Sequence, residues 1–160
     1  MVKYLARCGV RGENPENTMP AFQAAADQGY AYLELPVQIT KDLQCVVLKD
    51  TTVNRTARRA DGGAVGAALP AAWVDYVQLM DLDFGIGYHV KFKGTKIPLL
   101  KDVLTFARES GMKVKITADC WKLRQTNREA LFALLDSFAD VAELTVNTQE
   151  ALMETVSRYP

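Results

Sequence analysis

Several features that would identify a common class of protein are scarce or missing in this chain. Its 160 residues include one histidine, His89, and three widely spaced cysteines, Cys8, Cys45 and Cys120. An odd number of cysteines at these spacings forms neither a CxxC metal pair nor a disulfide framework, so we expect free thiols. Cys45 lies in an apolar run and is expected to be a small core residue.

An excess of charge of one sign is also missing. Nineteen Lys and Arg balance nineteen Asp and Glu, so no basic surplus favours nucleic acid or an anionic membrane as a partner. No apolar run approaches ~18 residues, and the N-terminus lacks the apolar centre of a secretion signal. We therefore expect a soluble cytoplasmic protein. A net charge near zero removes one defence against self-association.

The order of short apolar runs and helical patterns indicates a single α/β domain over residues 1–160. Such alternation is typical of βα units around a parallel sheet. We expect about five parallel strands with flanking helices. The strands are predicted at residues 4–6, 31–39, 45–48, 112–118 and 141–146, with a tight connection at 40–42. The helices are predicted at residues 20–26, 75–82 (capped by Asp75), 99–109, 130–138 (capped by Thr126 or Asn127) and 148–157.

Four short motifs follow one another in the first third of the chain. They are Ala6-Arg7-Cys8-Gly9, Pro15-Glu16-Asn17-Thr18, Glu34-Leu35-Pro36 and Leu48-Lys49-Asp50. Their order and spacing resemble the glycerophosphodiester phosphodiesterase family, whose members carry Ala-His-Arg-Gly, Pro-Glu-Asn-Thr, Glu-Leu-Asp and His-Asp. The resemblance runs from residue 4 to about residue 159. It implies a partial TIM-type (βα) barrel made of roughly the first five strands.

The resemblance also implies which positions would carry chemistry. Family members use two histidines as general acid and base, and a divalent cation held by carboxylates. Arg7 and Lys49 stand at the histidine positions, Pro36 at a metal-binding aspartate, and Thr117 at the carboxylate of the fourth strand. Glu34 is the only expected ligand position kept, and Asp119, two residues beyond Thr117, could partly substitute. We expect no cofactor, with Mg²⁺ or Ca²⁺ only if the family site survives.

Each replacement at the predicted barrel mouth leaves alternatives. Arg7 stays protonated, so it could clamp an anionic ligand or form a structural salt bridge. Lys49 could act as base or nucleophile if burial lowered its pKa, although Asp50 and Glu34 would keep it charged. Pro36 deletes a ligand and lacks the N–H that a central strand uses.

A thiol beside a cation is a further candidate nucleophile. Cys8 follows Arg7, and a neighbouring cation lowers the pKa of a thiol. His89 lies in residues 85–96, which resemble the substrate-cap insertion of the family. It could reach over the mouth as a base, or it could be a surface residue. A small molecule could occupy this mouth.

Five strands are too few for a complete barrel, which takes ~250 residues. We therefore expect open edges on the first and last strands and an apolar inner face exposed to water, both of which favour a homo-oligomer. Trp73, Tyr76 and Val77 form a second candidate contact surface. Alternatively, Trp73 folds back on the core, or the chain is a fragment.

Three functional hypotheses follow from these observations. The first is a catalytically inactivated or redesigned scaffold that self-associates, either a natural pseudoenzyme or an engineered protein, so we lean away from an enzyme. The second is a re-tasked enzyme in which Lys49 or Cys8 is the nucleophile or base. The third is a residual metal-dependent phosphodiesterase that uses Glu34 and Asp119.

Overall fold

The computed structural model describes residues 2–118 and 124–145, and its centre is a parallel sheet. The strand order along this sheet is β1-β2-β4-β5. The strands are β1 (Leu5–Arg7), β2 (Tyr32–Ile39), β4 (Lys113–Thr117) and β5 (Ala142–Thr145). Each pairs in parallel with its neighbour, as a partial barrel requires.

The third strand departs from the prediction of about five parallel strands. β3 (Cys45–Val47) pairs antiparallel with β2, with Val37 opposite Val47. The connection is a tight turn closed by the hydrogen bond from the N–H of Thr40 to the carbonyl of Gln44, 3.0 Å. A parallel crossover needs a dozen or more residues, so this turn permits only a hairpin. The sheet therefore has four parallel strands and one antiparallel strand.

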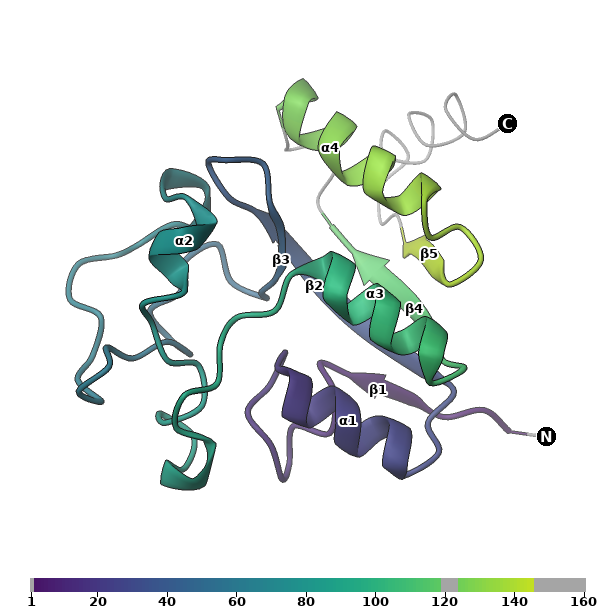
Figure 1. The fold of residues 1–160 in the computed structure, drawn as a ribbon, viewed down its shortest axis with the longest axis horizontal. Coiled ribbons are helices and arrows are strands. Elements are labelled where there is room, and N and C mark those ends of the chain that lie inside the picture. Colours follow the sequence, from purple (N-terminus) through teal and green to yellow (C-terminus); the bar gives the residue numbers. More distant parts are fainter. Residues whose placement is uncertain (1, 119–123, 146–160) are drawn as a thin grey trace.

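Three helices cover one face of the sheet. Figure 1 shows α1 (Met19–Asp27), α3 (Leu100–Glu109) and α4 (Gln125–Asp136) in front of the strands. The buried positions of β2 alternate along the strand and join the core beneath these helices. They are Leu33, Leu35, Val37 and Ile39. Burial of such apolar side chains is the main force that holds helix to sheet.

Most predicted helices are found at the expected positions, but some differ from the prediction in length. The helices predicted at 20–26 and 99–109 are present, and Asp75 is the N-cap of α2 (Tyr76–Leu79), which is shorter than predicted. The cap at Thr126 or Asn127 is wrong, because α4 begins earlier with Arg124 as its N-cap. The helix predicted at 148–157 lies outside the described residues.

The opposite face of the sheet is polar, which corrects the expectation of an apolar inner face. β4 alternates between exposed or half-buried Lys113, Lys115 and Thr117 and buried Val114 and Ile116. Parallel strands that are covered on both faces read as continuous apolar runs, whereas this strand alternates. The alternation in the sequence therefore already indicates a sheet with one wet face.

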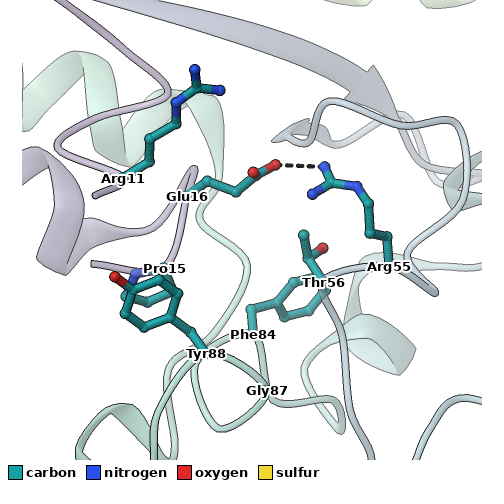
Figure 2. A pocket seen from close by; sticks show the side chains of 8 residues that line it. All are labelled: Arg11, Pro15, Glu16, Arg55, Thr56, Phe84, Gly87 and Tyr88. Atoms are coloured by element: carbon teal, nitrogen blue, oxygen red, sulfur yellow. Dashed lines mark hydrogen bonds and ion pairs between the residues drawn. The ribbon is translucent and has the colours of Figure 1, made fainter. Parts of the chain in front are cut away.

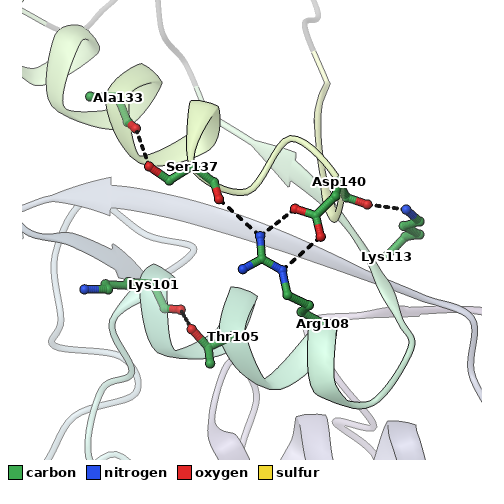
Figure 3. Close-up of polar contacts among 7 residues, drawn as sticks. All are labelled: Lys101, Thr105, Arg108, Lys113, Ala133, Ser137 and Asp140. Carbon is green, nitrogen blue, oxygen red and sulfur yellow. Dashed lines mark hydrogen bonds and ion pairs between the residues drawn. The ribbon is translucent and has the colours of Figure 1, made fainter.

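A polar contact joins the ends of α3, α4 and β4. The guanidinium of Arg108 donates to the carboxylate of Asp140 and to the carbonyl of Ser137, while the ammonium of Lys113 donates to the carbonyl of Asp140 (Figure 3). The bond from Arg108 holds the pKa of Asp140 below its usual value. Because these groups are exposed, they orient the turn more than they stabilise the fold.

A second core lies under the long segment between β3 and α3. It is built from apolar side chains of β3, α2 and the loops between β3 and α3, which include Val46, Leu48, Val53, Leu79, Phe84 and Ile97. Buried Asp83 organises this segment, because its carboxylate accepts N–H bonds from Gly85, Ile86 and Gly94 at 2.6–2.9 Å. Burial opposes ionisation of Asp83, but these three bonds outweigh it and lower its pKa. The 3-10 turns η1 (Ala71–Trp73) and η2 (Val90–Phe92) complete the segment.

Among residues 2–118 and 124–145, no helix has both the length and the apolar character needed to span a bilayer.

The buried thiol of Cys45 makes stability depend on pH. Burial raises the pKa of Cys45 from 9.0 to about 11. Below pH 9.0 the thiol is neutral in both states, and above it the unfolded chain ionises first, so stability falls as pH rises. Between about pH 8 and about pH 11, we expect the wild type to lose about 2 kcal/mol more than Cys45→Ala in denaturant titrations. Parallel pH curves for the two proteins would contradict this assignment.

Candidate functional site

A tight turn at the end of β1 positions the first candidate residue. Cys8 and Gly9 both have positive φ, 61° and 77°, and the N–H of Cys8 donates to the carbonyl of Glu34 at 2.9 Å. A Cβ on Gly9 would lie 2.6 Å from the Cβ of Ala21, so only glycine fits against α1 there. This turn leaves Arg7 as the last residue of β1, beside β2.

Arg7 and Glu34 form a salt bridge at the carboxyl end of the sheet. The two residues are register partners on β1 and β2, and Arg7 Nε lies 3.2 Å from Glu34 Oε1. The Arg7 side chain is 65% exposed and that of Glu34 25% exposed, so the pair contributes at most about 1 kcal/mol to stability. Its consequence is chemical, because the guanidinium places a permanent positive charge against Glu34, the only expected metal-ligand position that the chain keeps.

Pro36 does not break its strand, because β2 continues to Ile39. The carbonyl of Pro36 accepts from the N–H of Leu48 at 3.0 Å, so this side of the residue faces β3. In a strand, the N–H and C=O of one residue point to the same side. The missing N–H of Pro36 therefore falls where pairing with β1 has ended at Glu34 and pairing with β3 begins at Val37.

The residues near Glu34 do not form a set that fits a divalent cation. Pro36 offers no side-chain ligand, and the hydroxyl of Thr117 donates to the carbonyl of Leu35 at 3.3 Å. Within residues 2–118 and 124–145, no three His, Cys, Asp or Glu side chains are grouped as metal ligands. Asp119 lies outside the described residues. Hard cations need several converging oxygens, and Glu34, already paired with Arg7, supplies only one carboxylate.

Cys8 is not the activated thiol that its neighbour Arg7 suggested. The residue is 3% exposed, and burial, followed by the negative charge of Glu16, raises the pKa of its thiol. Arg11, a hydrogen bond from Asn17 and Arg7 act in the opposite direction but do not outweigh these causes. The adjacency of Arg7 in the sequence predicted a lowered thiol pKa. This prediction was wrong in sign, because it left out the effect of burial.

Lys49 is exposed, so the apolar enclosure that would turn it into a base is missing. Asp50, the next residue, is committed to another partner. The guanidinium of Arg55 lies 2.5 Å from the carboxylates of both Asp50 and Glu16. Arg55 thereby ties the loop after β3 to the β1–α1 loop, and these hydrogen bonds raise its own pKa.

The segment predicted to cap the mouth does reach the β1–α1 loop, but through a tyrosine. The hydroxyl of Tyr88 donates to the carbonyl of Gly12 at 2.8 Å. His89 is exposed, and its Nδ1 accepts from the N–H of Lys91 at 3.1 Å, which caps η2. This histidine therefore serves its own turn, and the structure gives it no hydrogen bond to Cys8.

A cleft of about 210 Å³ lies where these two segments meet the loop after β3, and its lining includes none of the predicted nucleophiles. Figure 2 shows the ion pair of Glu16 and Arg55 at the top of the view, with Pro15, Tyr88 and Phe84 below it. Arg11 also lines the cleft and makes no salt bridge with another described residue. The sequence resemblance covers Glu16 and Arg55, but no pattern indicated Arg11 or Tyr88 as partners across the cleft.

The predicted contact residues differ in exposure. Trp73 and Val77 are 74% and 70% exposed, so Trp73 does not fold back on the core. Tyr76 is half-buried against the second core, and its hydroxyl donates to the carbonyl of Ile97 at 3.2 Å. Tyr76 therefore supports the surface from below, while Trp73 and Val77 face water.

The chain resembles curated phosphodiesterases in sequence. An uncharacterized protein of Bacillus subtilis, YqiK, is 34% identical over 116 residues, which cover 72% of this chain and 44% of that protein. A glycerophosphodiester phosphodiesterase of Caldanaerobacter subterraneus is 36% identical over 102 residues, which cover 64% of this chain and 39% of that enzyme. The chain thus spans less than half of the length of these relatives.

Solved structures agree with the fold. A glycerophosphodiester phosphodiesterase from Agrobacterium tumefaciens has a TM-score of 0.75 at 25% identity and covers 94% of this chain and 60% of its own. An Oleispira antarctica phosphodiesterase, solved with the product sn-glycerol-3-phosphate, has a TM-score of 0.84 at 21% identity and covers 100% and 63%. The described sheet and helices are therefore part of a TIM-type barrel.

The decisive comparison is with the model of a whole family, which matches residues 9–154. Because that match includes most of the chain, the protein belongs to the glycerophosphoryl diester phosphodiesterase family.

Proposed function

We propose that this chain is a catalytically inactive member of its family that acts as a binding and assembly scaffold. The observation that carries the proposal is the salt bridge between Arg7 and Glu34, next to Pro36. The guanidinium of Arg7 lies against Glu34, the one expected metal ligand that is kept. Pro36, at the adjacent ligand position, has no side-chain oxygen. The proposal holds whether the replacements arose naturally or by engineering.

Loss of proton transfer supports the same conclusion. General acid–base catalysis needs a group that titrates near the working pH, and both family histidine positions carry other residues. Arg7 stays charged at any working pH, and exposed Lys49 lacks the burial that would make it a base. His89, the only histidine of the chain, is engaged in capping η2. The described mouth therefore offers no proton shuttle.

The alternative of a re-tasked enzyme loses its main support in the same geometry. A nucleophilic thiol needs access and thiolate character, and Cys8 is buried with a raised pKa. A nucleophilic lysine needs an apolar pocket, and Lys49 is exposed. A small-molecule ligand remains part of the scaffold proposal, with the cleft beside Arg11 and Tyr88 as its place.

Self-association is the second part of the proposal. Trp73 and Val77 expose large apolar side chains, and among the described strands β1 and β5 each pair with a single neighbour. Exposed apolar groups and unpaired strand edges both favour contact with another chain.

The inertness of Cys8 can be measured directly. With a thiol-directed reagent at neutral pH, we expect Cys8 of the folded chain to react at least about a hundredfold more slowly than in the unfolded chain. Burial and the raised pKa both cause this protection. A Ser110→Cys variant supplies an exposed control thiol on the same scaffold, and mass mapping assigns each adduct. Labelling of Cys8 faster than the control would revive the nucleophile hypothesis.

The absence of hydrolysis is the second expected outcome. Incubated with glycerophosphocholine and millimolar Mg²⁺ or Ca²⁺, the chain should release no glycerol 3-phosphate above a protein-free blank, because the described residues of the mouth offer neither a proton shuttle nor a group of cation ligands. Glu34→Ala should behave identically in the same coupled assay. Release that rises with added metal and vanishes in Glu34→Ala would show a residual phosphodiesterase instead.

Restoring ligands should create a cation site where the wild type has none. The variant Arg7→His/Pro36→Asp/Thr117→Glu removes the competing guanidinium and adds two carboxylates beside Glu34. We expect Ca²⁺ binding with a dissociation constant of about 1 mM or tighter by isothermal titration calorimetry. Arg7→Ala alone, which adds no ligand, serves as the control and should not bind. Equal affinity of the wild type would refute the reasoning.

A further inference from the structure

The face of the sheet opposite α1, α3 and α4 carries a row of alternating charges. Arg7 of β1 is the register partner of Glu34 of β2, which is the partner of Lys115 of β4, which is the partner of Glu143 of β5. Register partners on adjacent strands point to the same face. The row therefore reads plus, minus, plus, minus across the whole parallel sheet. We call these four residues the charge row.

The charge row lies on the face away from α1, α3 and α4. Its neighbours along each strand, such as Ala6, Leu33 and Ile116, are buried in the core beneath those helices. Arg7 and Glu143 are exposed, whereas Glu34 and Lys115 are half-buried. None of the described helices covers this face (Figure 1). Parallel sheets are normally covered on both sides, and residues 2–118 and 124–145 supply no helix for the second side.

Half of the charge row has no ionic partner within the described chain. Arg7 and Glu34 form a salt bridge, but Lys115 and Glu143 form none with a described residue. Lys115 instead lies with its ammonium 5.2 Å from the centre of the Tyr32 ring, on the same face. With respect to the described residues, the ammonium of Lys115 and the carboxylate of Glu143 can therefore meet an external partner with the complementary order of charges.

The order of charges makes the row complementary to itself in one orientation only. Rotation of a second copy by a two-fold axis parallel to the strands reverses the row, so plus faces minus at all four positions. Arg7 then faces the second copy's Glu143, and Glu34 faces its Lys115. A two-fold axis across the strands keeps the order, so like charges face each other. Symmetric dimers use such self-complementary patches, and like-charge contacts exclude the wrong orientation.

We propose that two copies of this chain dock through their charge rows, face to face, about a two-fold axis parallel to the strands. All strands of the dimer then run in the same direction, and each sheet supplies the missing cover of the other. This inference rests on the self-association proposed above and names its surface. It differs from a contact through Trp73 or through strand edges, because the opposing charges lie in the middle of the face.

A charge-swapped variant tests the proposal without changing the net charge. Arg7→Glu/Glu143→Arg converts the row to minus, minus, plus, plus, and two copies of it still place plus against minus at all four positions about the proposed axis. A mixed dimer with the wild type has like charges at two of its four contacts, whether the axis runs parallel to the strands or across them. The variant should therefore dimerise with itself in preference to the wild type. Native mass spectrometry of an equimolar mixture, after isotope labelling of one protein, measures the mixed dimer. We expect the mixed dimer to be at least about tenfold less abundant than random mixing would give, which corresponds to a free-energy difference of about 1.4 kcal/mol.

A matched control places the same kind of change on the helical side. Lys101→Glu/Glu109→Lys exchanges two exposed charges of α3, and this variant should mix randomly with the wild type. Wild-type dimer affinity should also fall at least about tenfold between about 50 mM and about 500 mM NaCl in sedimentation experiments, because the contacts are ionic.

The outcomes separate this inference from the proposal beneath it. Random mixing of the charge-swapped variant would overturn the charge-row interface but leave self-association through another surface. A wild type that stays monomeric at about 100 µM, near the weak end of specific dimers, would overturn both. If circular dichroism shows that the swapped chain does not fold, the wild-type salt dependence decides, and an unchanged dimer affinity contradicts the interface.

Discussion

The salt bridge between Arg7 and Glu34 is the constraint on which the chemistry of this barrel end depends. Strand register brings the two residues together, and the Cys8–Gly9 turn ends β1 at that point. A guanidinium resembles a metal ion in charge but not in function. It can donate hydrogen bonds to an anion, but it does not coordinate water or phosphate oxygens as a metal ion does, and it does not exchange protons near neutral pH. In the proposed function, the architecture of the family is thus kept while the groups that move protons and capture a cation are replaced.

The same salt bridge belongs to a larger pattern on the wet face of the sheet. The buried apolar residues of β2 and β4 point towards the helices, and the charged residues Glu34, Lys113 and Lys115 lie on the other side. Charged groups tolerate water, so this face of the sheet does not depend on an apolar cover. The charges alternate in sign from Arg7 to Glu143. In the proposed dimer, this alternation supplies the specificity that an apolar face would lack.

Local patterns in the sequence predicted most of the elements, and the motif spacing predicted the barrel. Contacts between segments that are distant in the sequence were harder to predict. The direction of β3 could have been read from the short 40–44 turn, but the apolar run alone does not specify it. Burial of Cys8 follows from the packing of a loop on α1, which adjacency to Arg7 cannot reveal. The hydrogen bond from Tyr88 to Gly12 beside the cleft joins residues 76 positions apart, so no local sequence pattern predicts it.

The most direct test of the account is a crystal structure of the chain grown in millimolar Ca²⁺. The account predicts that the guanidinium of Arg7 stays on the carboxylate of Glu34, as in the 3.2 Å contact described above. It also predicts no ion within coordination distance of that carboxylate, about 2.3–2.6 Å. A calcium ion bound to Glu34, with Arg7 turned away from it, would contradict the central claim.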